Sequence, residues 1–185
     1  MYRMNPKYLL PIFFCFLALG IQAQPTVTYD TIPAGSYIVD MGRKTGVTYN
    51  NGLKPYGLVF SLVRYQKIPI TWSINPTKTK DGIDFTHNGK DYKGGPFIIK
   101  AGFRDAVIDS IVADWESKGV IVDTVVSQQL VPLYTTITYL PTLFIDPQND
   151  GLVTPYFENA GIPDTIYEID YPNNMIGSCA DFFAL

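Results

Sequence analysis

The chain contains little histidine, cysteine and charge. Its 185 residues include one histidine and two cysteines, and only 17% of them are Asp, Glu, Lys or Arg. Two cysteines are too few for a disulfide scaffold or for a zinc site with four thiolate ligands. The net charge of −3 excludes a general nucleic-acid binder, which needs clustered Lys and Arg. The hydrophobic fraction of 46% is that of an ordinary globular domain and excludes wholesale disorder.

The first 23 residues have the pattern of a secretory signal peptide. Arg3 and Lys7 precede an apolar stretch over residues 8–21, and the small residue Ala23 follows it. The stretch is shorter than the roughly 20 residues that span a bilayer, so cleavage after Ala23 is favoured over an uncleaved membrane anchor. We therefore expect a mature chain without a transmembrane span that is exported to the periplasm, the cell surface or the medium.

Hydrophobic periodicity after residue 35 alternates between strand and helix. Residues 24–35 indicate an extended lead-in, and apolar positions recur at helical spacing after Pro55 and between Val107 and Trp115. Asn88-Gly89 is the two-residue turn typical of a β-hairpin, because both positions require positive φ. A short helix is expected over 154–160, and strands are expected at 36–41, 68–74, 84–87, 90–93, 97–99, 120–126, within 130–145, at 165–169 and from Asp181 onwards.

This order predicts an α/β domain over residues 36–185, with a mostly parallel sheet flanked by helices. We expect a three-layer arrangement, flavodoxin-like or amidotransferase-like, with the hairpin at Asn88-Gly89 inserted into it. The sequence stops at Leu185 within an apolar strand, which a parallel sheet would normally cover with a further helix. The domain is therefore expected to be an incomplete fragment, truncated at the C-terminus.

Open α/β sheets bind ligands beyond the carboxyl ends of their strands. Applied to the predicted strands, this rule selects a ligand-site face made of five residues that follow strands or lie in the adjoining turns. They are Asp40, Asn75, Lys78, Asp146 and Ser178.

The sequence contains no pattern that assigns catalysis, a cofactor or a metal. Asp146–Gly151 begins like a calcium loop, but Phe157 stands where the bidentate twelfth-position glutamate should be, so we expect a turn without tight calcium binding. The loop 77–82 has two lysines but lacks the glycines of a phosphate loop. His87 adjoins the hairpin turn and is expected to be exposed, whereas Cys179 is expected to be an ordinary buried thiol.

Several segments resemble the N-terminal region of large exported surface proteins of gliding Bacteroidetes. The segments are Tyr56-Gly57-Leu58-Val59, Ile74–Lys78, Lys80–Phe85, Asn88–Gly95 and Gly177–Asp181, which together span most of the mature chain. The resemblance implies an exported protein with further domains in the same full-length chain, and it implies no particular activity.

A second, fainter similarity is to α/β domains of the class I glutamine-amidotransferase type. It rests on the strand Leu143–Asp146, the helix after it, Ala160-Gly161-Ile162-Pro163, and the strand Ile166–Ile169. In such domains the nucleophilic cysteine and the histidine would lie beyond Leu185, so the similarity assigns no catalytic residue to this chain.

Three functions follow from these observations. The first is a non-catalytic N-terminal domain of an exported cell-surface protein. The second is part of a hydrolase or amidotransferase-like enzyme whose catalytic residues lie beyond Leu185. The third is a carbohydrate- or peptide-binding module, which the 13 tyrosines and 11 phenylalanines favour.

Overall fold

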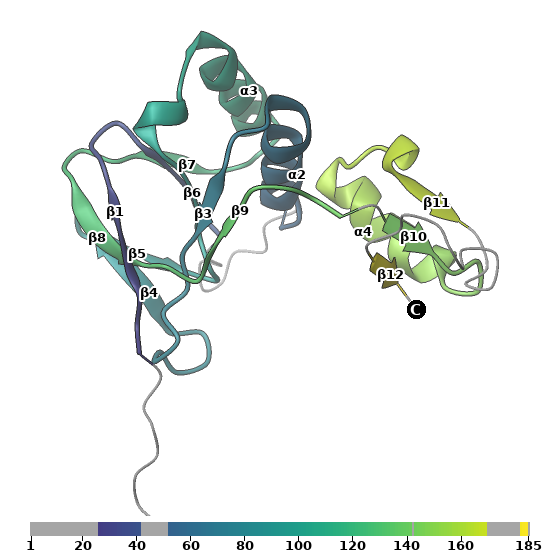
Figure 1. Ribbon diagram of the computed structural model, residues 1–185, viewed down its shortest axis with the longest axis horizontal. Helices are drawn as coiled ribbons and strands as arrows, with labels where there is room; N and C mark the ends of the chain where they lie inside the picture. The colour runs from purple at the N-terminus through teal and green to yellow at the C-terminus, as the bar shows by residue number, and fades with distance from the viewer. Residues whose placement is uncertain (1–25, 42–51, 142, 170–181, 185) are drawn as a thin grey trace, which may run out of the picture.

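The computed structural model describes residues 26–41, 52–141, 143–169 and 182–184 (Figure 1). Its largest element is a five-stranded sheet with the strand order β7-β2-β6-β3-β9. Each of these strands is three residues long, and their bounds are β2 Tyr37–Val39, β3 Ile70–Trp72, β6 Phe97–Ile99, β7 Val122–Thr124 and β9 Thr135–Ile137. The predicted signal peptide, Ser178 and Cys179 lie outside the described residues.

The prediction of a mostly parallel sheet is wrong, because all neighbouring strands in this sheet are antiparallel. Helix α2 (Lys54–Ser61) connects β2 to β3, and helix α3 (Ala106–Ser117) follows β6 and precedes β7. Both helices are crossovers between strands that run in the same direction. The two strands of each pair are not neighbours, however, since β6 lies between β2 and β3, and β2 lies between β6 and β7. This interleaving is the split β-α-β pattern known from ferredoxin-like sheets.

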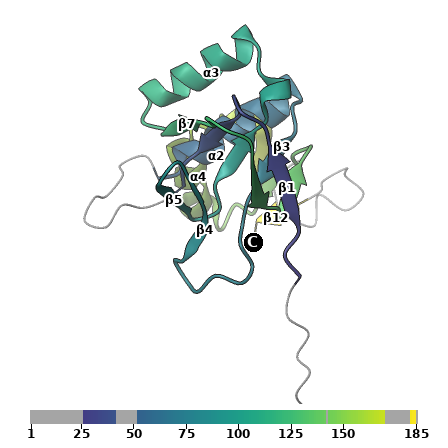
Figure 2. The ribbon, with the colours of Figure 1, turned by 90° about the vertical axis from the view of Figure 1, so that its left-hand side faces the viewer.

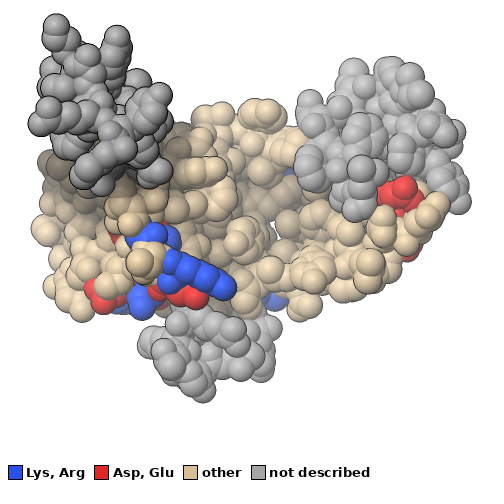
Figure 3. All heavy atoms as spheres, turned by 90° about the horizontal axis from the view of Figure 1, so that it is seen from below, with Lys and Arg blue, Asp and Glu red and all other residues tan. Residues whose placement is uncertain are grey.

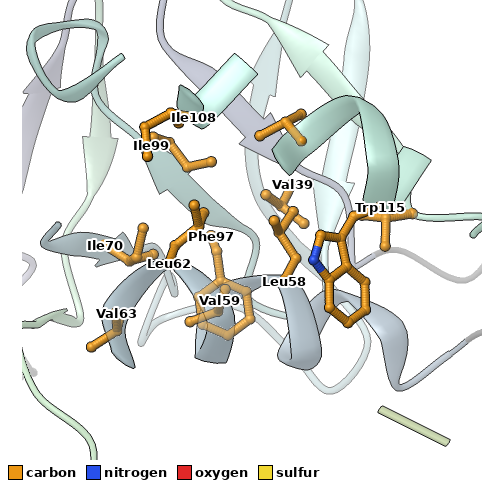
Figure 4. Packing of buried hydrophobic residues seen from close by; sticks show 12 residues of the cluster. Val39, Leu58, Val59, Leu62, Val63, Ile70, Phe97, Ile99, Ile108 and Trp115 are labelled. Carbon is orange, nitrogen blue, oxygen red and sulfur yellow. The ribbon is translucent and has the colours of Figure 1, made fainter. Parts of the chain in front are cut away.

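The helices cover one face of the sheet and form the larger core. Alternate strand residues point toward them, including Val39, Phe97 and Ile99, and all three are buried. Figure 4 shows that the side chains packed against this face of the sheet come from both helices, among them Leu58 of α2 and Trp115 of α3. Asp105 caps α3 by accepting hydrogen bonds from two backbone N–H groups of its first turn, as an N-cap carboxylate does. The amphipathic pattern that predicted both helices is confirmed.

The opposite face of the sheet is covered by strands. Ile38 and Ile98 point to this side and form a second core with residues of an antiparallel ribbon and a hairpin. Figure 2 looks onto this layer. The ribbon joins β1 (Tyr29–Ile32) to β8 (Gln129–Pro132), so the predicted lead-in contains a strand, and the hairpin joins β4 (Ile83–His87) to β5 (Lys90–Lys93). We call these four strands the strand layer.

The hairpin turn has the geometry that its sequence predicts. Asn88 and Gly89 have φ values of 49° and 77°, and His87 is the cross-strand partner of Lys90. A left-handed pair of this kind matches the natural twist of the two strands that it joins. The predicted hairpin is therefore confirmed, but it belongs to the strand layer and is not an insertion into a parallel sheet.

The C-terminal part of the described chain forms a separate parallel sheet with the order β11-β10-β12. Its elements are β10 (Leu143–Ile145), α4 (Asp150–Ala160), β11 (Tyr167–Ile169) and β12 (Phe182–Ala184). Helix α4 begins four residues earlier than predicted, so Pro155 lies inside it, and Gly161 ends it with a φ of 73°. Phe157 of α4 stacks on Tyr167 of β11, with ring centroids 5.1 Å apart.

Three shorter helical turns complete the described chain. A π-helical turn, η3 (Leu62–Gln66), extends α2 and ends at Lys67, whose φ is 58°. The 3₁₀ turns η4 (Ala101–Phe103) and η5 (Asp164–Ile166) precede α3 and β11. Within the described residues, no helix combines the length and the apolar character that crossing a membrane requires.

Candidate functional site

Asp84 is the most deeply buried carboxylate among the described ion pairs. Its side chain is 0% exposed, and its Oδ1 atom accepts from the backbone N–H of Asn75 at 2.9 Å and from Lys78 Nζ at 2.6 Å. Its Oδ2 atom accepts from the backbone N–H of Gly95 at 2.9 Å. The buried charge is thus met by one cation and two N–H donors, which is what a carboxylate needs inside a protein. Asp84 holds the loop after β3 to the turn before β6.

Gly95 completes this arrangement from the other side. Its φ is +75°, and a Cβ atom there would lie 2.7 Å from Trp72 Nε1. The indole N–H donates to the carbonyl oxygen of Gly95 at 2.9 Å. Glycine is required at this position both by the left-handed backbone and by the close approach of the indole ring.

Lys90 forms a second charged cluster, between the strand layer and the main sheet. Its Nζ atom lies 2.8 Å from Asp40 Oδ2 and 2.6 Å from Asp123 Oδ2, and the Tyr92 hydroxyl donates to the same Asp123 oxygen at 3.1 Å. Burial alone would lower the pKa of Lys90, but the hydrogen bonds to Asp123 and Asp40 outweigh it, and the pKa is raised. Burial, together with the negative charge of Asp123, raises the pKa of the Tyr92 phenol.

Arg104 forms a third cluster, beside the start of α3. Its guanidinium donates to both carboxylate oxygens of Asp109, at 2.9 and 3.1 Å, and to the Tyr37 hydroxyl at 2.6 Å. It also donates to the carbonyl oxygen of Gly35 and lies 3.6 Å from the centroid of the Tyr37 ring. The neighbouring guanidinium lowers the pKa of Asp109, and the planar fork of arginine suits this bidentate contact.

The residues predicted as one ligand-site face are divided among separate places. Asn75 and Lys78 meet at Asp84, whereas Asp40 lies beside Lys90. Asp146 follows β10 of the C-terminal sheet and accepts from the backbone N–H of Gln148 at 2.8 Å. The rule that grouped these residues assumes a single parallel sheet, and the described chain has an antiparallel main sheet instead. Ser178 lies outside the described residues.

The prediction that His87 is exposed is wrong. The side chain is buried, with 5% of the residue exposed. Its Nδ1 atom lies 2.5 Å from Gln129 Oε1, and its Nε2 atom accepts from the backbone N–H of Val126 at 3.1 Å. The turn itself is at the surface, but His87 is the last strand residue and points inward onto the strand layer's core.

Three important charged residues were not singled out by the sequence. They are Asp84, Asp123 and Arg104. Asp84 turns inward because an irregularity in the pairing of β4 with β5, between Ile83 and Phe85, places two successive residues on the buried side. An alternating strand pattern assigns adjacent residues to opposite faces, so the sequence contains no signal for this orientation.

The described residues contain no group of three or more His, Cys, Asp or Glu side chains that could hold a metal ion. On the face shown in Figure 3, basic and acidic side chains lie side by side on one part, while most of the remaining described surface there is uncharged. The described part of that face therefore has no extended patch of a single charge.

Four aromatic side chains form a continuous row near the β3–β9 edge of the main sheet. The centroid of Trp72 lies 5.2 Å from that of Tyr134 and 5.5 Å from that of Phe97, and Tyr56 lies 5.8 Å from Phe97. Phe97 is buried, Tyr134 is 61% exposed and Tyr56 is 42% exposed. We call these four residues the aromatic row. Both of its ends reach the surface.

Comparisons with known proteins identify no relative of this chain. A scan against models of protein families found no match. Searches of curated proteins and of solved structures also found no match.

Proposed function

We propose that this chain is a non-catalytic domain of an exported cell-surface protein. A non-catalytic role is supported most by the contacts of three charged residues, which join separate parts of the fold. Asp84 joins two loops, Lys90 bridges carboxylates on or beside β2 and β7, and Arg104 joins β2 to α3, each with an oppositely charged partner within hydrogen-bond distance. A catalytic acid or base needs a proton-transfer partner in the substrate, whereas these groups join parts of the fold.

Export is supported by the first 23 residues, which combine two cations with a short apolar stretch. The resemblance to exported surface proteins of gliding Bacteroidetes points the same way. Lys80–Phe85 and Asn88–Gly95, which carry much of that resemblance, contain Asp84, Lys90 and Gly95. These two segments therefore contain residues that build the loops and the hairpin of the strand layer.

Expression of the full chain in a Bacteroidetes host tests this proposal. We expect intact-mass measurement to show a mature chain that begins at Gln24, and we expect protease added to intact cells to digest it. The matched control is the double variant Phe14→Asp, Leu17→Asp, which places charge in the apolar stretch and should retain the precursor inside the cell. Recovery of the wild-type precursor with Met1 to Ala23 attached, protected until the cells are lysed, would contradict export.

The aromatic row supports a second candidate, a carbohydrate-binding module. Tyr134 presents an exposed ring beside the half-buried Trp72, and the exposed Thr135 follows it on β9 as the cross-strand partner of Trp72. Sugar rings stack their apolar faces on aromatic side chains, and hydroxyl-bearing neighbours supply hydrogen bonds. Because Trp72 is one of two tryptophans, a ligand on this row should change the intrinsic fluorescence.

Titration with soluble oligosaccharides, followed by tryptophan fluorescence, tests this candidate. Tyr134→Ala should abolish a saturable change, and Tyr156→Ala is the matched control because Tyr156 is similarly exposed, at 65%, but lies on α4. A response that Tyr134→Ala leaves intact, or the absence of any response across neutral and acidic glycans, would rule out the row as a sugar site.

A further inference from the structure

His87 connects the hairpin of the strand layer to the corner between β7 and β8. Its side chain accepts from the backbone N–H of Val126 in that corner and contacts Gln129 at the start of β8. The neighbouring Phe85 and Tyr92 rings stack with centroids 5.0 Å apart in the same core. The imidazole is therefore a polar connection at the edge of an apolar interface.

The two contacts fix which ring nitrogen carries the proton. A backbone N–H can only donate, so Nε2 must be the unprotonated nitrogen that accepts from Val126. Nδ1 must then carry the hydrogen and donate to the side-chain oxygen of Gln129. The structure therefore accommodates the neutral ring, in one tautomer. A doubly protonated ring would direct Nε2–H against the N–H of Val126, and two donors cannot form a hydrogen bond.

Among the described hydrogen bonds, the partner of His87 Nε2 is the backbone N–H of Val126, and that group cannot accept the second proton. Gln129 and Val126 are uncharged, and residues 125–132 contain no titratable side chain. The titratable groups on the adjoining strands pair elsewhere: Lys90 with Asp40 and Asp123, Tyr92 with Asp123, Asp84 with Lys78, Asp91 with Thr86, and Asp30 with Lys100. Lys93 on β5 is exposed.

We propose that His87 is a pH-sensitive latch that holds the hairpin to the β7–β8 corner when neutral and releases it on acidification. A proton added to Nε2 would occupy the lone pair that accepts from the N–H of Val126 and so would break that contact, and histidine is the side chain whose charge changes near neutral pH. The Lys90 cluster contains no imidazole, and the raised pKa of Lys90 keeps that lysine charged on acidification. The hairpin should therefore open at its His87 end while its other contacts to the main sheet persist.

The single histidine of this chain makes the test direct, and ¹⁵N NMR of the ring is the first measurement. At pH 7.5 we expect a protonated Nδ1 and an unprotonated Nε2, which is the less common tautomer of free histidine. Hydrogen exchange at pH 7.5 and 5.5, corrected for the intrinsic rates, should show a loss of protection at Val126 and in the hairpin at the lower pH, with α2 and α3 unchanged. The Nε2–H tautomer, or unchanged protection of Val126, would overturn the latch.

A variant pair gives an independent readout. The urea midpoint of the wild-type chain should fall between pH 7.5 and 5.5, and His87→Phe should lose this dependence even if its midpoint is lower throughout. Lys93→Met changes an exposed hairpin residue and should keep the wild-type response. If His87→Phe does not fold, the NMR and exchange measurements on the wild-type chain decide the question. A His87→Phe variant that retains the full pH dependence would overturn the proposal.

Discussion

Lys90 Nζ lies 2.6 Å from Oδ2 of Asp123, which joins the hairpin to the edge strand of the main sheet. The same ammonium group lies 2.8 Å from Asp40, the residue after β2. One lysine thus bridges two carboxylates that belong to neighbouring strands. The strand layer is held to the sheet by charge here and by apolar packing in the second core.

Replacing Lys90 should weaken this junction. Lys90→Met keeps the length of the side chain but removes the cation between Asp40 and Asp123, so we expect the free energy of unfolding to fall by about 1–2 kcal/mol. Lys93→Met is the matched control, because Lys93 is an exposed lysine on the same strand. Urea unfolding at neutral pH measures both variants, and equal midpoints would contradict the role given to Lys90.

Tyr92 should make the fold sensitive to alkali. Its pKa is raised by burial and by Asp123, so its contribution to stability is complete below the ordinary tyrosine value and is lost as the pH rises above about 10. We expect the urea midpoint to drop between pH 9 and pH 11, and Tyr92→Phe to reduce that drop. Tyr156→Phe, which alters an exposed phenol, should reproduce the wild-type decline. If Tyr92→Phe showed the same decline, the Tyr92 phenol would not be the cause of the sensitivity to alkali.

Gly57 should be essential for the contact between α2 and α4. A Cβ atom at this position would lie 1.8 Å from the carbonyl oxygen of Ala160 and 2.4 Å from Trp115 Cη2. Gly57→Ala should therefore destabilise the chain by about 1–3 kcal/mol through steric strain, although alanine favours helices. Gly102→Ala, where an added Cβ meets nothing within 4 Å, is the control. Thermal unfolding and hydrogen exchange of α4 measure the effect, and a more stable Gly57→Ala variant would show that the helices are not in close contact.

Local elements were the part of the fold that could be predicted. The Asn88-Gly89 hairpin and helix α3 follow from short-range rules, because positive φ and apolar spacing act within a few residues. The direction of strand pairing could not be predicted in the same way. Each strand of the main sheet has three residues, and a helical crossover shows that two strands run the same way without showing whether they are neighbours. The interleaved antiparallel strands were missed for this reason.

Two residues of the predicted ligand-site face lie together in the structure, and the others lie elsewhere or outside the described residues. Asn75 and Lys78 are close together because both bind Asp84, which lies six residues after Lys78 in the chain. The sequence predicts His87 at the surface because it adjoins a turn, but its position at the end of β4 turns it inward onto Gln129. That contact spans 42 residues of sequence. Contacts of this range depend on the packing of layers, about which a single sequence gives little information.

A double-mutant cycle on Lys78 and Asp84 measures directly whether charged side chains hold loops and layers together. The variants are Lys78→Met, Asp84→Asn and the two combined, measured by urea unfolding. We expect each single change to be destabilising and the pair to be coupled by about 1–3 kcal/mol, because the 2.6 Å contact involves a fully buried carboxylate. Additive effects, with a coupling energy near zero, would show that this ion pair does not hold the loop after β3 in place.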